Sequence, residues 1–246
     1  MRKYLLWPYQ IYSWIIFVPY LGISTLFFGL LTIILVSTTS PRFASMFVGK
    51  TWTRLIAYMT PIFVKVEGRE NIVPGQSYVI VSNHQSLYDI AVIYGWLGVD
   101  IRWVMKKELR KVPGLGPACA KIGHIFIDRT SFKESLKAIY AAKDVLTDGT
   151  SVVFFPEGTR TETGELGEFK RGAFKIAYDL ELPVLPITIV GTREILPSKS
   201  VLICPGRVKM VIHPPVHLEG KKKSSIAVVQ EEVRETIKSA LESAHK

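Results

Sequence analysis

Residues 78–89 read YVIVSNHQSLYD, and a change from strand to helix within them decides the fold class. Tyr78–Ser82 is a short run of mostly apolar residues, which is typical of a buried strand. Ser86 and Asp89 have the spacing of a helix-capping pair, with a hydroxyl at the N-cap and an acid three residues later. His84 falls in the turn between the two elements. A strand followed directly by a capped helix predicts an α/β arrangement here.

His84 and Asp89 can meet only across this turn. On one continuous helix, five residues rotate by about 500°, which would point the two side chains about 140° apart. If His84 precedes the helix, Asp89 in the first turn can reach back to one ring nitrogen. That contact would fix the tautomer and leave the other nitrogen available as a base. Alternatively, His84 is only a turn residue and Asp89 only caps the helix. The two residues alone do not decide between this structural interpretation and a catalytic one.

From Pro61 onward, apolar runs of strand length alternate with helical patterns. This alternation predicts an α/β domain with a largely parallel sheet flanked by helices. The expected strands are Ile62–Val66, Tyr78–Ser82, Ile101–Met105, His124–Ile127, Ser151–Phe155, Val184–Val190 and Val208–Ile212. The expected helices are Leu87–Trp96, Phe132–Leu146, Arg171–Leu180 and Ser225–Ala244. Ligands of such sheets bind beyond the carboxyl ends of the strands, so the residues after each strand are site candidates.

The sequence FPEGTR, residues 155–160, follows one of these strands. Gly158 permits a close approach of the backbone to a ligand. Arg160 offers a planar fork that matches a phosphate or a carboxylate, and Thr159 could add a donor. Glu157 would either brace Arg160 or contact a hydroxyl group. A surface turn with an ordinary ion pair is the alternative.

Three further strands carry candidates. Lys106 follows IRWVM, Arg129 ends GHIFIDR (residues 123–129), and Pro186 lies inside VLPITI (residues 184–189). Because proline cannot donate within a central ladder, Pro186 predicts an edge, a bulge or a site-lining position. The strand ends thus gather a base and several cations, without a nucleophilic serine or cysteine beside the histidine. No metal site is expected, since the remaining histidines are scattered.

The N-terminal segment carries no charge from Tyr4 to Pro41. As one helix these residues would reach ~57 Å, nearly twice a hydrocarbon core of ~30 Å. We therefore expect a break, either at Pro19–Gly22 or at Ser37–Pro41. The stretch Phe43–Tyr58 mixes apolar residues with Lys50 and Arg54, which predicts an amphipathic helix at a membrane surface.

Two layouts fit this segment, namely a single span and a hairpin that returns to the side it entered from. Basic residues at both flanks favour the hairpin. We expect residues 1–60 to form a membrane-associated two-helix segment and residues 61–246 to form the α/β domain.

The net charge of +10 suits anionic headgroups or phosphorylated substrates. Nucleic acid is disfavoured because the aromatic residues cluster in the apolar N-terminus rather than among the cations. The two cysteines form no disulfide framework.

Four blocks together resemble a known family. NHQSLYD (residues 83–89) contains the H-x4-D signature of the glycerolipid acyltransferases, and GHIFIDR, FPEGTR and VLPITI match the second, third and fourth blocks in order. The chain resembles most closely the bacterial PlsC-type 1-acyl-sn-glycerol-3-phosphate acyltransferases, also called lysophosphatidic acid acyltransferases. The resemblance implies transfer of a fatty acyl group from acyl-CoA or acyl-carrier protein to the 2-hydroxyl of lysophosphatidate, giving phosphatidic acid. It implies no cofactor and no acyl-enzyme.

The same resemblance assigns roles to residues. His84 becomes the general base and Asp89 orients it. Arg160 becomes the main phosphate ligand, and the other implied residues are Lys106 and Arg129 for the same phosphate, Glu157, Gly158 and Thr159 in the acceptor-binding loop, and Asn83 and Pro186 lining the site. Glycerol 3-phosphate or another lysophospholipid is an alternative acceptor, and a non-catalytic lipid or coenzyme A binder is an alternative of another class. The expected partner is the phospholipid bilayer, at the cytoplasmic face of the bacterial inner membrane.

Overall fold

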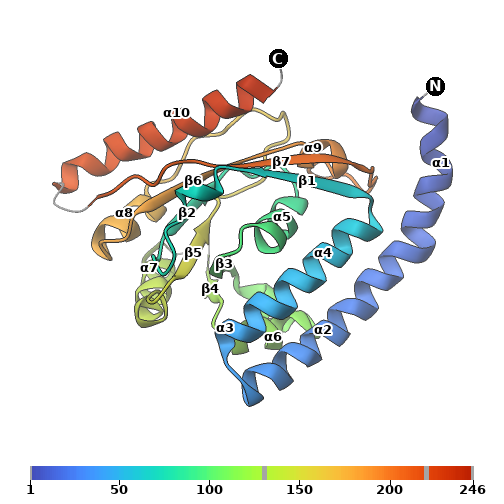
Figure 1. Ribbon diagram of the computed structural model, residues 1–246, viewed down its shortest axis with the longest axis horizontal. Coiled ribbons are helices and arrows are strands. Elements are labelled where there is room, and N and C mark those ends of the chain that lie inside the picture. The colour runs from blue at the N-terminus through green and yellow to red at the C-terminus, as the bar shows by residue number, and fades with distance from the viewer. Residues whose placement is uncertain (1, 129–131, 219–221, 245–246) are drawn as a thin grey trace.

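The computed structural model describes residues 2–128, 132–218 and 222–244. Its centre is a seven-stranded sheet in the order β1-β7-β6-β2-β5-β3-β4 (Figure 1). Neighbouring strands are parallel except β6 and β7, which confirms the expected α/β class. The strands are β1 (Ile62–Glu67), β2 (Val79–Ser82), β3 (Asp100–Lys106), β4 (Ile125–Ile127), β5 (Thr150–Phe154), β6 (Val184–Val190) and β7 (Gly206–Ile212). Every expected strand is present, with ends within about two residues of the prediction.

Helices cover both faces of the sheet (Figure 1). α5 (Tyr88–Trp96) lies on one face, and α8 (Gly172–Asp179) and α10 (Ile226–Ala244) lie on the other. α7 (Phe132–Ala141) ends earlier than expected and is followed by a 3₁₀ turn at Lys143–Val145. Alternate residues of β2 point into the two cores, Ile80 toward α5 and Val81 toward α8.

Two helices were not expected, α6 (Leu115–Ile122) and α9 (Thr192–Ile195). The sequence of α6 begins Leu-Gly-Pro, which is typical of a loop, but a proline is tolerated in a first helical turn because its missing N–H is not needed there. α9 is a single turn, too short to show a helical period.

The N-terminal segment is a helical hairpin. One long helix runs through α1 (Arg2–Tyr12), a π-helical turn at Ser13–Phe17 and α2 (Val18–Thr38). The chain reverses at Thr39 and Ser40 and returns through α3 (Pro41–Ala44), a second π-helical turn (Ser45–Gly49) and α4 (Lys50–Met59). The break is therefore at the second expected place, whereas Pro19 lies inside the long helix, directly after a π-helical turn.

α2 and α4 lie along the side of the α/β domain, whereas α1 extends away from it toward the N-terminus (Figure 1). α2 approaches α6 so closely that a Cβ on Gly29 would lie 2.5 Å from the carbonyl oxygen of Gly114. α4 packs on α5, where Arg54 Nε donates to Gly95 O at 2.8 Å. The domain thus supports both arms of the hairpin.

Pro186 lies in an interior strand, so the edge position expected as one possibility is wrong. β6 is flanked by β2 and β7. The regular ladder to β7 begins at Ile187, and the next contact on that side is an isolated bridge between Val184 and Val216. Pro186 lies in this interruption, where its carbonyl accepts from His213 N at 3.0 Å. Its missing N–H therefore breaks no regular pairing with β7.

Candidate active site

His84 and Asp89 meet across the turn between β2 and α5. His84 Nδ1 lies 2.8 Å from Asp89 Oδ2. The Asp89 side chain is fully buried, and 13% of the His84 side chain is exposed. A carboxylate only accepts, so Nδ1 of a neutral ring carries the proton and Nε2 has a free lone pair. Nε2 makes no hydrogen bond with any residue that the structure describes, which leaves it available as a base.

The backbone of the turn fixes the carboxylate. Asp89 Oδ2 also accepts from Gln85 N at 2.7 Å and from Ser86 N at 2.8 Å. The acid therefore reaches back as a capping-box residue does. The Ser86 hydroxyl accepts from Tyr88 N at 3.2 Å and donates to Leu196 O at 2.8 Å. Ser86 is thus a capping residue whose proton is already engaged.

A third side chain contacts Asp89, and sequence reasoning missed it. Thr192 Oγ1 donates to Asp89 Oδ1 at 2.5 Å. Thr192 is the first residue of α9, beyond the carboxyl end of β6. The available signal was its position two residues after a strand that was expected to end at the site.

Glu157 holds the backbone of His84. Its Oε1 accepts from His84 N at 2.8 Å, and its Oε2 accepts from Gly167 N at 2.9 Å. Thr161 N donates in turn to His84 O at 2.9 Å. Burial raises the pKa of Glu157. In this structure its carboxylate therefore holds the turn that carries His84 and, among the described residues, does not brace Arg160. Its role in the acceptor-binding loop stays a prediction.

Aromatic rings fix the plane of the imidazole. The His84 ring lies on Phe155, with the centroids 3.8 Å apart and the planes 10° apart. Trp103 stacks next to Phe155 at 5.8 Å. The imidazole consequently has an apolar wall on one side.

Arg160 lies next to Thr161 and hence close to the backbone of His84. It is half-buried, and within the described part of the chain it makes no hydrogen bond or ion pair. Lys170 lies beside the same loop, since a Cβ on Gly158 would lie 2.7 Å from its Nζ. Gly158 has a φ of +79°, a conformation that favours glycine, and Thr159 is exposed. Two cations and a tight glycine turn therefore lie near His84.

The remaining predicted residues lie in different surroundings. Asn83 is fully buried, and its amide exchanges two hydrogen bonds of 2.8 Å with the backbone of Ile189, so it joins β2 to β6. Lys106 is exposed at the end of β3 and pairs with Glu108 at 3.7 Å, with no contact to the dyad. Arg129 lies outside the described residues. The phosphate-binding role of Lys106 and the site-lining roles of Asn83 and Pro186 stay predictions.

Comparison with known proteins gives the family. The family model described as Acyltransferase matches residues 63–190. The 1-acyl-sn-glycerol-3-phosphate acyltransferase of Pseudomonas aeruginosa is 34% identical over 218 residues, covering 87% of this chain and 84% of the relative. The chain belongs to the acyltransferase family.

Other relatives of the chain are longer. The chloroplastic 1-acyl-sn-glycerol-3-phosphate acyltransferase of Arabidopsis thaliana is 35% identical over 174 residues, which are 70% of this chain and 48% of the relative. The chain thus spans about half the length of its plant relative. Among solved structures, the LPA acyltransferase PlsC from Thermotoga maritima superposes with a TM-score of 0.81 at 27% identity, covering 100% of this chain and 98% of that one.

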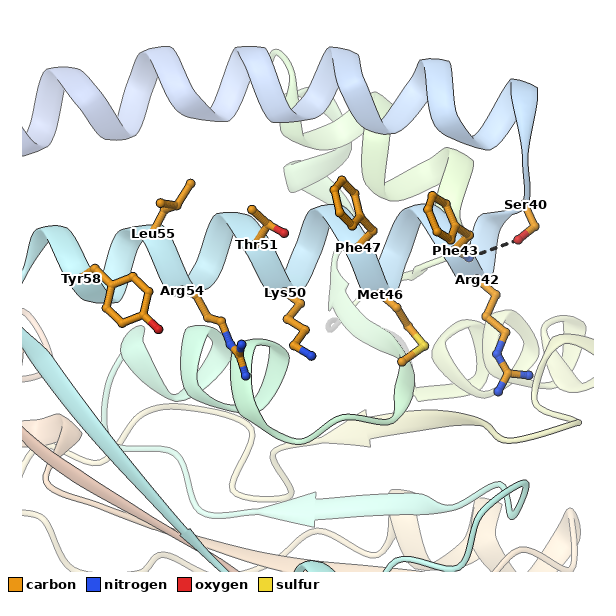
Figure 2. Close-up of a pocket in the computed structure, with 10 residues that line it drawn as sticks. All are labelled: Ser40, Arg42, Phe43, Met46, Phe47, Lys50, Thr51, Arg54, Leu55 and Tyr58. Atoms are coloured by element: carbon orange, nitrogen blue, oxygen red, sulfur yellow. Dashed lines mark hydrogen bonds between the residues drawn. The ribbon is translucent and has the colours of Figure 1, made fainter.

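The chain also presents a mixed basic and aromatic face on the second arm of its hairpin. Figure 2 shows two rows of side chains along α3 and α4, which border a shallow groove. One row contains the cations and the other is mainly apolar; their members are Arg42, Met46, Lys50, Arg54 and Tyr58, and Phe43, Phe47, Thr51 and Leu55. The rings of Phe43 and Phe47 stack at 5.7 Å, and both are about half exposed, at 49% and 51%.

The first arm of the hairpin is apolar and largely uncovered. The helical stretch Trp7–Thr38 is long and apolar enough to cross a membrane by length and composition. Large exposed side chains follow along it, namely Trp7, Ile11, Trp14, Ile15, Ile16, Ile23, Leu26, Phe27, Leu30 and Ile34. Exposed apolar surface on this scale marks a contact with an apolar partner.

Proposed function

We propose that this acyltransferase moves a fatty acyl group from a thioester, acyl-CoA or acyl-carrier protein, to the 2-hydroxyl of 1-acyl-sn-glycerol 3-phosphate. The product is phosphatidic acid. The relatives from Pseudomonas aeruginosa and Arabidopsis thaliana carry names of this activity. The observation that carries the proposal is the fixed His84–Asp89 pair with an open ring nitrogen at the carboxyl end of β2.

His84 Nε2 takes the proton of the acceptor's 2-hydroxyl while that oxygen attacks the thioester carbonyl. A carbon–oxygen bond forms, the carbon–sulfur bond breaks, and the imidazolium returns its proton to the leaving thiolate. Asp89 stabilises the imidazolium while it exists. General-base help of this kind contributes roughly 10²–10⁴-fold in rate, and positioning of the two substrates adds to it.

Direct transfer is supported by the state of the possible nucleophiles. The Ser86 hydroxyl donates to Leu196 O. Burial raises the pKa of the Cys119 thiol to about 12, so it stays protonated at neutral pH. No serine or cysteine side chain in the described part of the chain hydrogen-bonds to His84. The acceptor hydroxyl is therefore the group that His84 activates.

Arg160 and Lys170 are the proposed ligands of the acceptor phosphate. Both lie beside the loop that begins at Phe155, and neither forms an ion pair with a described residue. A guanidinium fork binds two phosphate oxygens at once, and an ammonium adds a second positive charge. A phosphate bound here would hold the glycerol hydroxyls next to the imidazole.

The hairpin is the proposed membrane anchor, embedded in one leaflet at the cytoplasmic face of the bacterial inner membrane. α2 lies along α6, so a hairpin that crossed the bilayer would carry the charged domain surface into hydrocarbon. In one leaflet, the exposed apolar side chains enter the lipid while Arg42, Lys50 and Arg54 lie at anionic headgroups.

Labelling tests this topology. One cysteine replaces Lys3 and another replaces Phe63, which is 70% exposed at the start of β1. We expect an impermeant maleimide to label both from the cytoplasmic side only. Labelling of the two positions from opposite sides would show a transmembrane span.

The activity is tested with purified protein in detergent and long-chain acyl-CoA. We expect free thiol and phosphatidic acid with lysophosphatidate, and much slower thiol release with glycerol 3-phosphate or lysophosphatidylcholine. Faster turnover of either of those acceptors would show that the proposed acceptor is wrong, while the proposed acyl transfer would stand. Binding of lysophosphatidate without thiol release, from either acyl-CoA or acyl-carrier protein, would identify a lipid-binding protein.

A further inference from the structure

We propose that Thr192 is a positioning residue for the catalytic pair, acting through Asp89. Its hydroxyl holds the second oxygen of the carboxylate and keeps the first oxygen on His84 during proton transfer. The catalytic readout of this inference rests on the proposed acyl transfer, whereas its spectroscopic readout does not.

The two oxygens of Asp89 are supported unequally. Oδ2 accepts from His84 Nδ1, Gln85 N and Ser86 N. Among the described residues, Oδ1 accepts only from Thr192 Oγ1, at 2.5 Å. Both side chains are fully buried, so water does not replace this donor. One hydroxyl therefore carries the whole hydrogen bonding of one carboxylate oxygen.

The element that supplies Thr192 also supports the other end of the turn. Leu196, which directly follows α9, accepts the Ser86 hydroxyl through its carbonyl, and Leu196 N donates to Thr192 O at 3.1 Å. α9 thus contacts the catalytic turn at Asp89 and at Ser86. These two contacts join α9 and the residue that follows it to the turn, although they lie about 100 residues away in the chain.

Loss of the Thr192 hydroxyl would leave a buried charged oxygen without a partner. A buried acceptor in that state is costly, so the carboxylate would rotate toward another donor or take up a proton. Either change weakens the contact with His84 Nδ1 that the imidazolium needs. Glu157, the other carboxylate at His84, is held by His84 N and Gly167 N and does not face Oδ1 in any contact.

The test compares Thr192→Val, Thr192→Ser and Thr188→Val. Thr188 is a matched control because it is also fully buried and hydrogen-bonds a histidine, His213 Nε2, at 2.8 Å, away from the dyad. We expect kcat of Thr192→Val to fall by about tenfold or more, the loss expected for one hydrogen bond to a charged group. The KM values for both substrates should stay within about threefold, because Thr192 is fully buried and presents no surface to a substrate. Thr192→Ser should recover most of kcat, and Thr188→Val should keep it.

A proton NMR measurement separates this inference from the activity. The Nδ1 proton of His84, shared with Asp89, should move in Thr192→Val and stay in place in Thr188→Val and Thr192→Ser. If wild type fails to turn over lysophosphatidate but this proton still moves, the proposed acceptor is wrong and the positioning role stands. An unmoved proton, or equal kcat in Thr192→Val and Thr188→Val, would overturn the positioning role.

Discussion

The edge of the sheet that carries His84 and Asp89 and the N-terminal hairpin differ in how their side chains are partnered. At the edge, Asp89 and Asn83 are fully buried, and each has hydrogen-bond partners within the chain. On the hairpin, large apolar side chains are left in the open, with Trp7 and Ile23 each 70% exposed. The polar side chains at the edge are thus satisfied within the chain, whereas large apolar side chains of the hairpin remain exposed.

This difference suits the two regions to separate tasks, namely proton transfer at the edge and membrane binding by the hairpin in the proposed function. Full burial of one large apolar side chain is worth about 1.5–3 kcal/mol, so several exposed ones supply ample binding energy for lipid. The polar contacts at the edge each contribute less, but in the proposed mechanism their geometry sets the rate of proton transfer. We therefore expect substitutions at the edge to change kcat and substitutions along the hairpin to change stability or membrane binding.

The largest effect is expected from Asp89→Asn. The amide retains the size of the side chain and can still accept from Gln85 N and Ser86 N, but it lacks the charge that stabilises the imidazolium. We expect kcat to fall roughly 10²–10⁴-fold, the range of general-base catalysis. Saturating thiol-release assays measure it.

Asp100→Asn is the matched control for this change. Asp100 is also buried, and it accepts hydrogen bonds from Arg102 Nη1 and Thr150 Oγ1. None of these three residues hydrogen-bonds to His84. It should lower the thermal midpoint while leaving kcat within about twofold, as expected for a buried ion pair outside the site. A similar kcat in both variants would remove the special role of Asp89.

The second effect concerns the phosphate. Arg160→Ala should raise the KM for lysophosphatidate by about 10–100-fold, corresponding to one lost charge-assisted contact of ~1.5–3 kcal/mol. The KM for acyl-CoA should stay near its wild-type value, and Arg160→Lys should recover part of the loss. Steady-state kinetics with each substrate varied in turn measure both constants. An unchanged acceptor KM would show that the phosphate binds elsewhere.

The third effect concerns the docking of the hairpin. Two glycine substitutions in the same helix should change the free energy of unfolding in opposite directions. A methyl group on Gly29 would meet the backbone of Gly114, whereas one on Gly22 in the same helix meets nothing within 4 Å. Gly29→Ala should therefore cost about 1–3 kcal/mol from overpacking, and Gly22→Ala should gain up to ~1 kcal/mol from helix propensity. Thermal unfolding in detergent should show midpoints that move in opposite directions. Equal shifts would mean that α2 is not docked on α6.

The smallest effect concerns His124, at the end of α6 beneath the hairpin. Burial, and secondarily the charge of Arg102, lowers the pKa of His124 to about 3. Its Nδ1 accepts from Trp103 N at 3.4 Å, which requires a neutral ring. The unfolded chain binds a proton near pH 6.5 and the folded protein does not, so stability falls as the pH drops from about 6.5 toward 3.

At pH 5 this linkage amounts to about 2 kcal/mol. His124→Gln, which cannot ionise, should lose less stability than wild type between pH 7 and pH 5. Denaturant midpoints at the two pH values measure the difference. Equal acid sensitivity in both proteins would show that His124 is not the responsible group.

The sheet could be predicted from the sequence because its central strands, such as β2 and β6, are buried on both faces and read as continuous apolar runs. The dyad could be predicted because His84 and Asp89 are local to one turn, where helix geometry restricts how they can meet. The contact of Thr192 with Asp89 could not, since it joins residues 103 positions apart in the chain. The bracing role of Glu157 was missed for a similar reason, because only the fold places its carboxylate under His84 N.

The hairpin shows which features of an apolar segment the sequence could not predict. Hydropathy predicted an apolar segment with a break and gave two possible places for it. Pro19 does not interrupt the helix because the π-helical turn before it takes up the irregularity, while Ser40 supplies the cap for the returning arm by accepting from Phe43 N at 3.1 Å (Figure 2). The docking of α2 on α6 depends on glycines that a sequence pattern does not pair.

The most direct test of the central claim, that His84 is the base in a direct acyl transfer, is thiol release by His84→Ala. With saturating lysophosphatidate and acyl-CoA, kcat should fall by at least about 10²-fold, while the Kd for lysophosphatidate stays within about threefold of wild type. The proposed phosphate ligands, Arg160 and Lys170, are untouched by this change, so binding and chemistry are separated in one variant. A kcat within a few-fold of wild type would contradict the account.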